Sequence, residues 1–208
     1  MKKALIWIIA AVVLVGIIAG ASALYSSLSE EYDPDGIDKI EPPVNQGNTS
    51  QGNGQGEDNE NESSDTGYSN PAPDFTVIDR EGNVVKLSDM KGKPVVLNFW
   101  ATWCPYCVEE MPDFEKVYNK YKGEVEFMMI NMTHGAETVE NASAFIDSYG
   151  YTFPVYFDIM QEAAYAYYAT SLPVSYFIDA EGNLVAYGRG RLDEASLERS
   201  IGMILDKQ

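Results

Sequence analysis

Histidine and cysteine are scarce in this chain of 208 residues, which has one histidine and two cysteines. A closed zinc site requires four ligands, so these three side chains cannot complete one. Cys104 and Cys107 are three positions apart, and a disulfide between them closes a very small loop, for which entropic stabilisation is least. The sequence therefore predicts no metal site and no cofactor, and it favours redox chemistry over a structural staple for the cysteine pair.

Basic residues are also in the minority, with 14 lysines and arginines against 32 acidic residues and a net charge of −18. Nucleic acids and anionic lipid surfaces attract basic proteins and repel acidic ones. The composition therefore argues against nucleic acid as a partner. Charged and apolar residues are unevenly spread, and they divide the chain into three regions.

The first region is an uncharged apolar run over residues 4–24, preceded by Lys2 and Lys3. At about 1.5 Å of rise per residue it can span the roughly 30 Å hydrocarbon core of a bilayer, and the lysines favour a cytoplasmic N-terminus. We therefore predict a single-pass transmembrane anchor over residues 1–25, which holds an extracytoplasmic domain at the cell membrane. A cleaved signal peptide is the alternative, because the Ala-Ser-Ala stretch ending at Ala23 fits the cleavage pattern, and cleavage there would give a secreted protein.

The second region, residues 26–70, is dominated by Gly, Asn, Gln, Ser and acidic residues. Its only basic residue is Lys39. Such a segment has too few apolar side chains to offset the entropy of ordering, and its charges repel one another. We predict a disordered acidic linker.

The third region, residues 71–208, has the length of one ordinary domain. Two D-x-E-G-N sequences, at Asp79 and Asp179, are flanked by apolar residues and predict β-hairpins. Strands alternating with helices, followed by a hairpin and a last helix, indicate an α/β sandwich with a mixed sheet. The runs expected to be buried strands are 94–100 and 125–132, and a short strand is expected at 153–158. The expected helices are 105–122, 137–149, 161–169 and 192–205.

Both cysteines lie where the first buried strand is expected to give way to a helix that begins near Pro105 and is kinked by Pro112. Cys104 would then face the unpaired backbone N–H groups and the positive end of the helix dipole, which stabilise a thiolate. We therefore predict Cys104 as the nucleophile and Cys107, one turn later, as the resolving thiol. Trp103 is expected to limit access to the sulfurs, with simple core packing as the alternative.

The stretch "NFWATWCPYCVEEMP" resembles the active-site segment of the TlpA/ResA-like thiol-disulfide oxidoreductases, a branch of the thioredoxin superfamily. The motif W-C-x-x-C-x-x-E-x-P and the cis-proline loop "SLPVSYFID" carry the resemblance, at Trp103, Cys104, Cys107, Glu110, Pro112 and Pro173. The resemblance covers all of residues 71–208. It implies a thioredoxin-like sandwich with a mixed central sheet flanked by helices, an N-terminal β-hairpin extension and a strand-helix insertion within 133–158.

By the same resemblance, the domain is expected to exchange disulfides with exported proteins as a reductant, supplied by a membrane or extracytoplasmic electron donor. Apocytochrome c before haem attachment is a candidate client. A cis bond before Pro173 would leave the backbone of Leu172 to pair with an extended substrate segment beside Cys104. Pro105 and Tyr106, between the cysteines, are expected to support that contact.

The chain departs from related patterns in two respects. Asn98 occupies the place where many thioredoxins carry an acidic residue that helps to deprotonate the resolving cysteine, and some ResA-like proteins carry Glu where this chain has Pro105-Tyr106. Glu110 is the nearest motif carboxylate and a candidate proton relay, although a surface or capping role is commoner for a helical glutamate. Proton transfer at Cys107 is left unassigned.

Two other functions are weaker alternatives. Thiol peroxidases of the redoxin group resemble P-x-x-x-T-x-x-C, but Ala101 stands at the threonine position. Copper-carrying modules of the same fold use C-x-x-x-C with a downstream histidine, and the spacing here is one residue short. The only histidine, His134, is expected in a solvated loop, and the tyrosine-rich stretch 165–171 is expected to support the core and the substrate loop.

Overall fold

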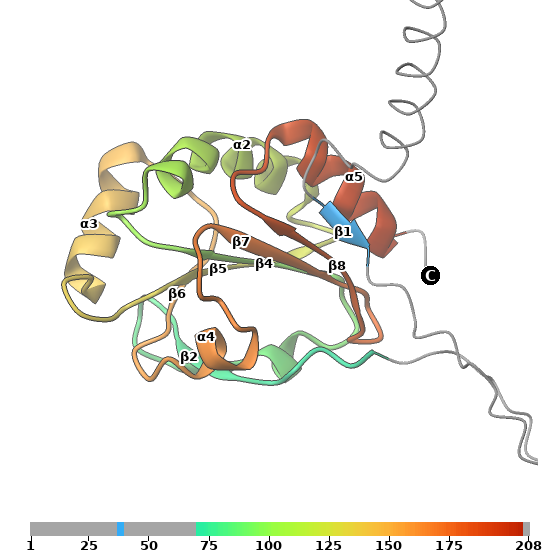
Figure 1. The fold of residues 1–208 in the computed structure, drawn as a ribbon, viewed down its shortest axis with the longest axis horizontal. Coiled ribbons are helices and arrows are strands. Elements are labelled where there is room, and N and C mark those ends of the chain that lie inside the picture. Colours follow the sequence, from blue (N-terminus) through green and yellow to red (C-terminus); the bar gives the residue numbers. More distant parts are fainter. Residues whose placement is uncertain (1–36, 40–69, 206–208) are drawn as a thin grey trace, which may run out of the picture. The chain divides into compact units, whose positions relative to one another are not determined.

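A computed structural model describes residues 37–39 and 70–205 (Figure 1). The predicted anchor and most of the predicted linker lie outside these ranges. Within them, no helix combines the length and apolar character that a membrane span requires.

The domain is built on one mixed sheet, whose centre is β4 (Val95–Trp100). All six residues of β4 are buried, as its continuous apolar and β-branched run predicts. It pairs in parallel with β5 (Glu126–Asn131) and antiparallel with β7 (Val174–Ile178). The remaining strands are β1 (Ile37–Lys39), β2 (Thr76–Ile78), β3 (Val84–Lys86), β6 (Val155–Phe157) and β8 (Leu184–Arg189). The order in the sheet is β1-β8-β7-β4-β5-β6-β2-β3.

Both predicted hairpins are confirmed. The first joins β2 (Thr76–Ile78) to β3 (Val84–Lys86) and extends the sheet beyond β6. The Asp79 carboxylate accepts the N–H groups of Glu81 and Asn83 and so shapes the turn. The second hairpin joins β7 to β8, and its Asp179 carboxylate accepts the N–H group of Asn183. A short 3₁₀ helix, η1 (Leu87–Met90), follows β3.

Helices cover both faces of the sheet (Figure 1). One face carries α2 (Pro105–Tyr121), α3 (Val139–Tyr149) and α5 (Glu194–Leu205), and the other carries α4 (Glu162–Ala166) with η1 and the first hairpin. Alternate residues of β4 point to opposite faces, so Val96 and Trp100 pack under α2 and Phe99 packs on the α4 side. Asn98 shares the face of Val96, which directs its polar side chain toward α2.

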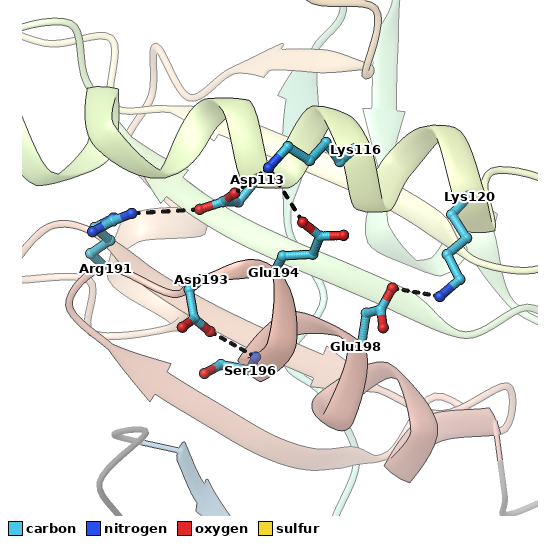
Figure 2. A network of polar contacts seen from close by, with 8 residues as sticks. All are labelled: Asp113, Lys116, Lys120, Arg191, Asp193, Glu194, Ser196 and Glu198. Atoms are coloured by element: carbon cyan, nitrogen blue, oxygen red, sulfur yellow. Dashed lines mark hydrogen bonds and ion pairs between the residues drawn. The ribbon is translucent and has the colours of Figure 1, made fainter.

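α2 and α5 lie side by side and are joined at their surface by ion pairs (Figure 2). Lys116 pairs with Glu194 at 3.3 Å, and Lys120 pairs with Glu198 one turn further along both helices. Exposed ion pairs contribute little to stability because solvent screens them. The buried apolar side chains beneath, including Phe114 and Ile201, therefore dominate the attachment of α5 to α2.

One strand, β1 (Ile37–Lys39), was not expected. It pairs antiparallel with β8, with Ile37 opposite Gly188 and Lys39 opposite Ala186, and Ile37 is buried. The prediction of a disordered linker over 26–70 is therefore wrong for these three residues. The physical reason is that an edge strand offers unpaired main-chain groups, to which a short segment with a single apolar side chain can add.

Replacing Ile37 tests how firmly β1 is held. We expect Ile37→Ala to lower the free energy of unfolding by about 1–2 kcal/mol, less than a truncation deep in a core, because the site lies at the sheet edge. Urea denaturation of the full chain measures the change. Val84→Ala, at a position that is 68% exposed, is the control and should change stability by less than about 0.5 kcal/mol. Equal stabilities of the two variants would mean that β1 adds nothing to the fold.

Candidate active site

The cysteine pair sits at the junction between β4 and α2, as predicted. Cys104 is the N-cap residue of α2, Pro105 is the first helical residue, and Cys104 and Cys107 form a disulfide with a Cα–Cα distance of 5.3 Å. The Cys107 N–H donates to Cys104 Sγ at 3.2 Å. Cys104 is 4% exposed and Cys107 is fully buried. Since the helix N-terminus points at the sulfur of Cys104, a thiolate there gains a hydrogen bond and a favourable dipole.

Aromatic side chains flank the disulfide on the protein surface. Trp103 and Tyr106 are each 62% exposed, and Pro105 is exposed between the cysteines. The alternative that Trp103 is a core residue is therefore wrong. The buried indole in this stretch is Trp100, which packs against Phe145 with ring centroids 5.8 Å apart. Exposed aromatic rings beside a reactive sulfur offer apolar contact area to a protein substrate.

The loop before β7 lies at the same end of the sheet as Cys104. β4 and β7 are antiparallel neighbours, with Phe99 opposite Val174, so the end of β4 is beside the start of β7. The Leu172–Pro173 bond is cis, as predicted. The carbonyl of Pro173 accepts the N–H of Gly190 at 2.9 Å, which ties the loop to the end of β8. The substrate-pairing role of Leu172 remains a prediction.

Glu110 is a buried carboxylate in α2, one turn beyond Cys107. It accepts the side-chain N–H of Asn98 at 2.8 Å and the backbone N–H of Leu192 at 3.0 Å. Burial raises the pKa of Glu110 from 4.5 to about 8, against the lowering effect of these two hydrogen bonds. A surface or capping role, the commoner one for a helical glutamate, is therefore wrong for Glu110, because the face of α2 that carries it packs on β4.

A family model described as the AhpC/TSA family matches residues 68–187. The chain belongs to the AhpC/TSA family. Thiol-disulfide oxidoreductase ResA of Bacillus thuringiensis is 40% identical over 128 residues, which cover 61% of this chain and 72% of that protein. The comparisons identify this family member as a protein thiol-disulfide oxidoreductase. Thiol-disulfide exchange is also the reaction that the cysteine pair predicts.

Solved structures of related proteins have the same fold. A thioredoxin-family thiol:disulfide interchange protein from Chlorobium tepidum is 28% identical with a TM-score of 0.58, over 66% of this chain and 97% of that one. The exposed lipoprotein thioredoxin Etrx1 of Streptococcus pneumoniae is 27% identical with a TM-score of 0.56, over 62% and 98%. The predicted thioredoxin-like sandwich is thereby confirmed for the described domain of this AhpC/TSA family member.

The polar cluster around Glu110 is the part of this oxidoreductase that could least be predicted from the sequence. Asn98 also donates to Ser175 Oγ at 3.1 Å from the directly opposite position on β7. Asn98 Oδ1 is buried and has no hydrogen-bond partner among the described residues. A protonated Glu110 would supply one if the Asn98 amide turned over, since a carboxylic acid donates where a carboxylate only accepts. Ser175 carries no motif, and only the strand pairing identifies it.

Other candidate positions are not part of this cluster. His134 is exposed in the loop after β5, as expected. In the tyrosine-rich stretch, Tyr167 is buried, whereas Tyr165 and Tyr168 are 83% and 80% exposed. No group of three or more His, Cys, Asp or Glu side chains in residues 37–39 and 70–205 is arranged to hold a metal ion.

The raised pKa of Glu110 predicts a distinct dependence of stability on pH. Because the pKa in the folded state (about 8) exceeds the ordinary 4.5, the favourable contribution of the protonated group is complete below about pH 4.5 and is lost as pH rises through 8. We expect the loss to be a few kcal/mol, at about 1.4 kcal/mol for each unit of pKa shift. Glu110→Gln resembles the protonated form, so its stability relative to the native sequence should increase over this range.

Urea denaturation of the oxidised chain at intervals from about pH 5 to 9 measures this difference. Glu109→Gln, at the exposed neighbouring position, is the matched control and should follow the native sequence throughout. Parallel curves for the native sequence and Glu110→Gln would show that Glu110 does not bind its proton more tightly in the folded state.

Proposed function

We propose that this thiol-disulfide oxidoreductase reduces disulfides of exported proteins through Cys104 and Cys107, on the extracytoplasmic side of a membrane to which residues 1–25 anchor it. The position of Cys104 at the N-cap of α2, with its sulfur 3.2 Å from the Cys107 N–H, carries the assignment of the site. Exposed Trp103 and Tyr106 beside it supply a surface for a protein substrate.

The exchange begins with the reduced enzyme. The Cys104 thiolate attacks one sulfur of the client disulfide, forming a mixed disulfide and releasing the other client sulfur as a thiolate, which takes up a proton. Cys107 then loses its proton and attacks Cys104 Sγ. This step forms the Cys104–Cys107 disulfide and releases the second client thiolate, which is also protonated. Two electrons and two protons pass to the client, and a donor thiol protein must return them to the enzyme.

In its ionised form, Glu110 is suited to accept the proton of Cys107 in the second step. It lies one helical turn away on the same helix, and its pKa of about 8 is close to the ordinary thiol value of about 8.5. Proton transfer between groups of similar pKa costs little free energy. Asn98, which cannot titrate, holds the Glu110 carboxylate rather than replacing it, so the two positions form one proton-relay unit.

The substrate would lie between the cysteine motif and the Pro173 loop. Both segments meet at one end of the sheet, and Leu172 is partly buried against the apolar side chains on both faces of the sheet. An extended client segment that passes Leu172 would present its sulfur to Cys104 from the exposed side, where Trp103 and Tyr106 lie. Apocytochrome c is the client class that the family resemblance implies.

The location rests on the N-terminal sequence. An uncharged run over residues 4–24 after Lys2 and Lys3 has the length and charge bias of a single-pass anchor. The related Streptococcus pneumoniae protein is described as an exposed lipoprotein, which supports an exported domain. An oxidising compartment supplies the disulfides on which such an enzyme acts.

Single-cysteine variants test the roles of the two thiols in cells. Because the chain has only two cysteines, any disulfide-linked adduct of Cys107→Ser must form through Cys104. We expect Cys107→Ser to accumulate adducts with exported proteins and Cys104→Ser to form none, since Cys107 is fully buried. Non-reducing electrophoresis with mass spectrometry identifies the adducts.

The same variant tests location. A membrane-impermeant maleimide added to intact cells should label Cys104 of Cys107→Ser. Labelling only after lysis, or adducts of cytoplasmic proteins alone, would overturn the extracytoplasmic assignment. Adducts of Cys104→Ser at the level of Cys107→Ser would overturn the assignment of the nucleophile.

The equilibrium of the Cys104–Cys107 pair with a glutathione redox buffer tests the direction of electron flow. A reductant of exported proteins should have a reduction potential near that of thioredoxin, about −270 mV, because its dithiol must be the less stable form. A value near −120 mV, typical of an oxidant such as DsbA, would reverse the proposed direction and leave the cysteine assignment intact.

A further inference from the structure

A second buried carboxylate, Glu137, holds the loop that leads into the active site. Glu137 lies between β5 and α3 and is 3% exposed. Its Oε1 accepts the backbone N–H of Thr102 at 2.9 Å and the side-chain N–H of Asn131 at 2.7 Å, and its Oε2 accepts the Thr102 hydroxyl at 2.6 Å. One carboxylate therefore fixes both the main chain and the side chain of Thr102.

Thr102 is placed where small movements reach the nucleophile. It lies between the end of β4 at Trp100 and the N-cap residue Cys104. The Cys104 N–H donates to the carbonyl of Ala101 at 3.2 Å, which closes a tight turn around Thr102. A turn held at its centre by Glu137 and closed by this hydrogen bond leaves the chain little freedom before Cys104.

The support behind Glu137 belongs to the central sheet. Asn131 ends β5, and its Oδ1 accepts the hydroxyl of Thr133 at 2.9 Å. The Glu137 N–H donates to the carbonyl of His134 at 3.2 Å, and Thr138 caps α3 immediately afterwards. Glu137 is thus held by β5 and the start of α3, and it transmits that rigidity to the loop after β4.

Burying a carboxylate costs free energy unless several hydrogen bonds compensate it. The three donors to Glu137 do so, and hydrogen bonds to a charged acceptor are about twice as strong as neutral ones. Thr102 is only half-buried, and a polar side chain smaller than glutamate would be enough to accept its N–H. The use of a buried carboxylate at this loop is therefore explained by a need to fix the geometry of the residues that follow.

We propose that Glu137 is a positioning residue for thiol-disulfide exchange, clamping Thr102 so that Cys104 is held at the N-terminus of α2. It does not touch the sulfurs and acts through the loop. The inference rests on the proposed function in one respect, namely that Cys104 is the attacking thiol. Loss of the clamp should let the loop move and weaken the alignment of Cys104 with the helix N–H groups.

The test compares Glu137→Ala with Glu137→Gln in the full chain. A glutamine oxygen can accept from Thr102 and Asn131 while its amide donates to the Thr102 hydroxyl, so Glu137→Gln keeps all three contacts without the charge. We expect Glu137→Ala to slow iodoacetamide alkylation of reduced Cys104 by about tenfold, since misplacement of a reacting group is costly. Glu137→Gln should restore the rate to within about twofold of the native value.

Two further readouts separate positioning from loss of stability. Rates are measured in the absence of denaturant on protein shown by circular dichroism to be folded, and the equilibrium with glutathione should shift about tenfold, equivalent to about 30 mV, in Glu137→Ala. Glu140→Ala, at an exposed position in the first turn of α3, is the control and should leave both quantities unchanged. If Glu137→Ala does not fold, Thr102→Val, which keeps the backbone N–H, carries the test with an expected rate loss of about threefold.

Several outcomes would overturn the inference. A folded Glu137→Ala with native alkylation rate and glutathione equilibrium would show a purely structural role. An equal loss in Glu137→Ala and Glu137→Gln would assign the effect to charge rather than to position. Native reactivity in Thr102→Val would remove the link to the loop. Retention of exchange activity in Cys104→Ser would instead refute the proposed function, so the two failures are distinguishable.

Discussion

The hydrogen bond from the Cys107 N–H to Cys104 Sγ, 3.2 Å long, is the interaction on which the chemistry of this fold depends. Because the N-cap residue of α2 is a cysteine, no side-chain oxygen accepts the first N–H groups of the helix, and Cys104 Sγ accepts one of them instead. This hydrogen bond forms only if the end of β4 places Cys104 at a fixed point beside the first turn of α2. The buried sheet, the turn at Thr102 and the packing of α2 together fix that point.

Two buried glutamates bracket this junction with opposite chemical designs. Glu137 receives three hydrogen bonds from two residues, which suits a carboxylate that stays in place. Glu110 receives two hydrogen bonds and is fully buried, and burial raises its pKa to about 8. One therefore serves the geometry of the loop before the nucleophile, and the other is able to exchange a proton after it. The cysteine motif indicated only Glu110, because Glu137 lies outside that segment.

Much of the domain could be predicted from the sequence because the relevant signals are local. The continuous apolar run of β4, the D-x-E-G-N turns and the cysteine spacing each specify structure within a few residues, and all were confirmed. The site of Glu110 could not be predicted in this way, since a helical glutamate becomes buried only through contact with Asn98, twelve residues earlier, and Leu192, 82 residues later. Trp103 and Trp100 have equal hydrophobicity, and only the end of the strand decides which is exposed.

The pairing of β1 changes the effective length of the connection between the domain and the proposed anchor. Ile37–Lys39 is paired with β8, and Asn70 is hydrogen-bonded to Leu184 of the same strand, so positions 39 and 70 are both fixed on β8. The chain available between anchor and domain is then 26–36 rather than 26–70. Under the proposed anchoring, the acidic residues 40–69 would connect two positions fixed on β8 instead of separating the domain from the membrane.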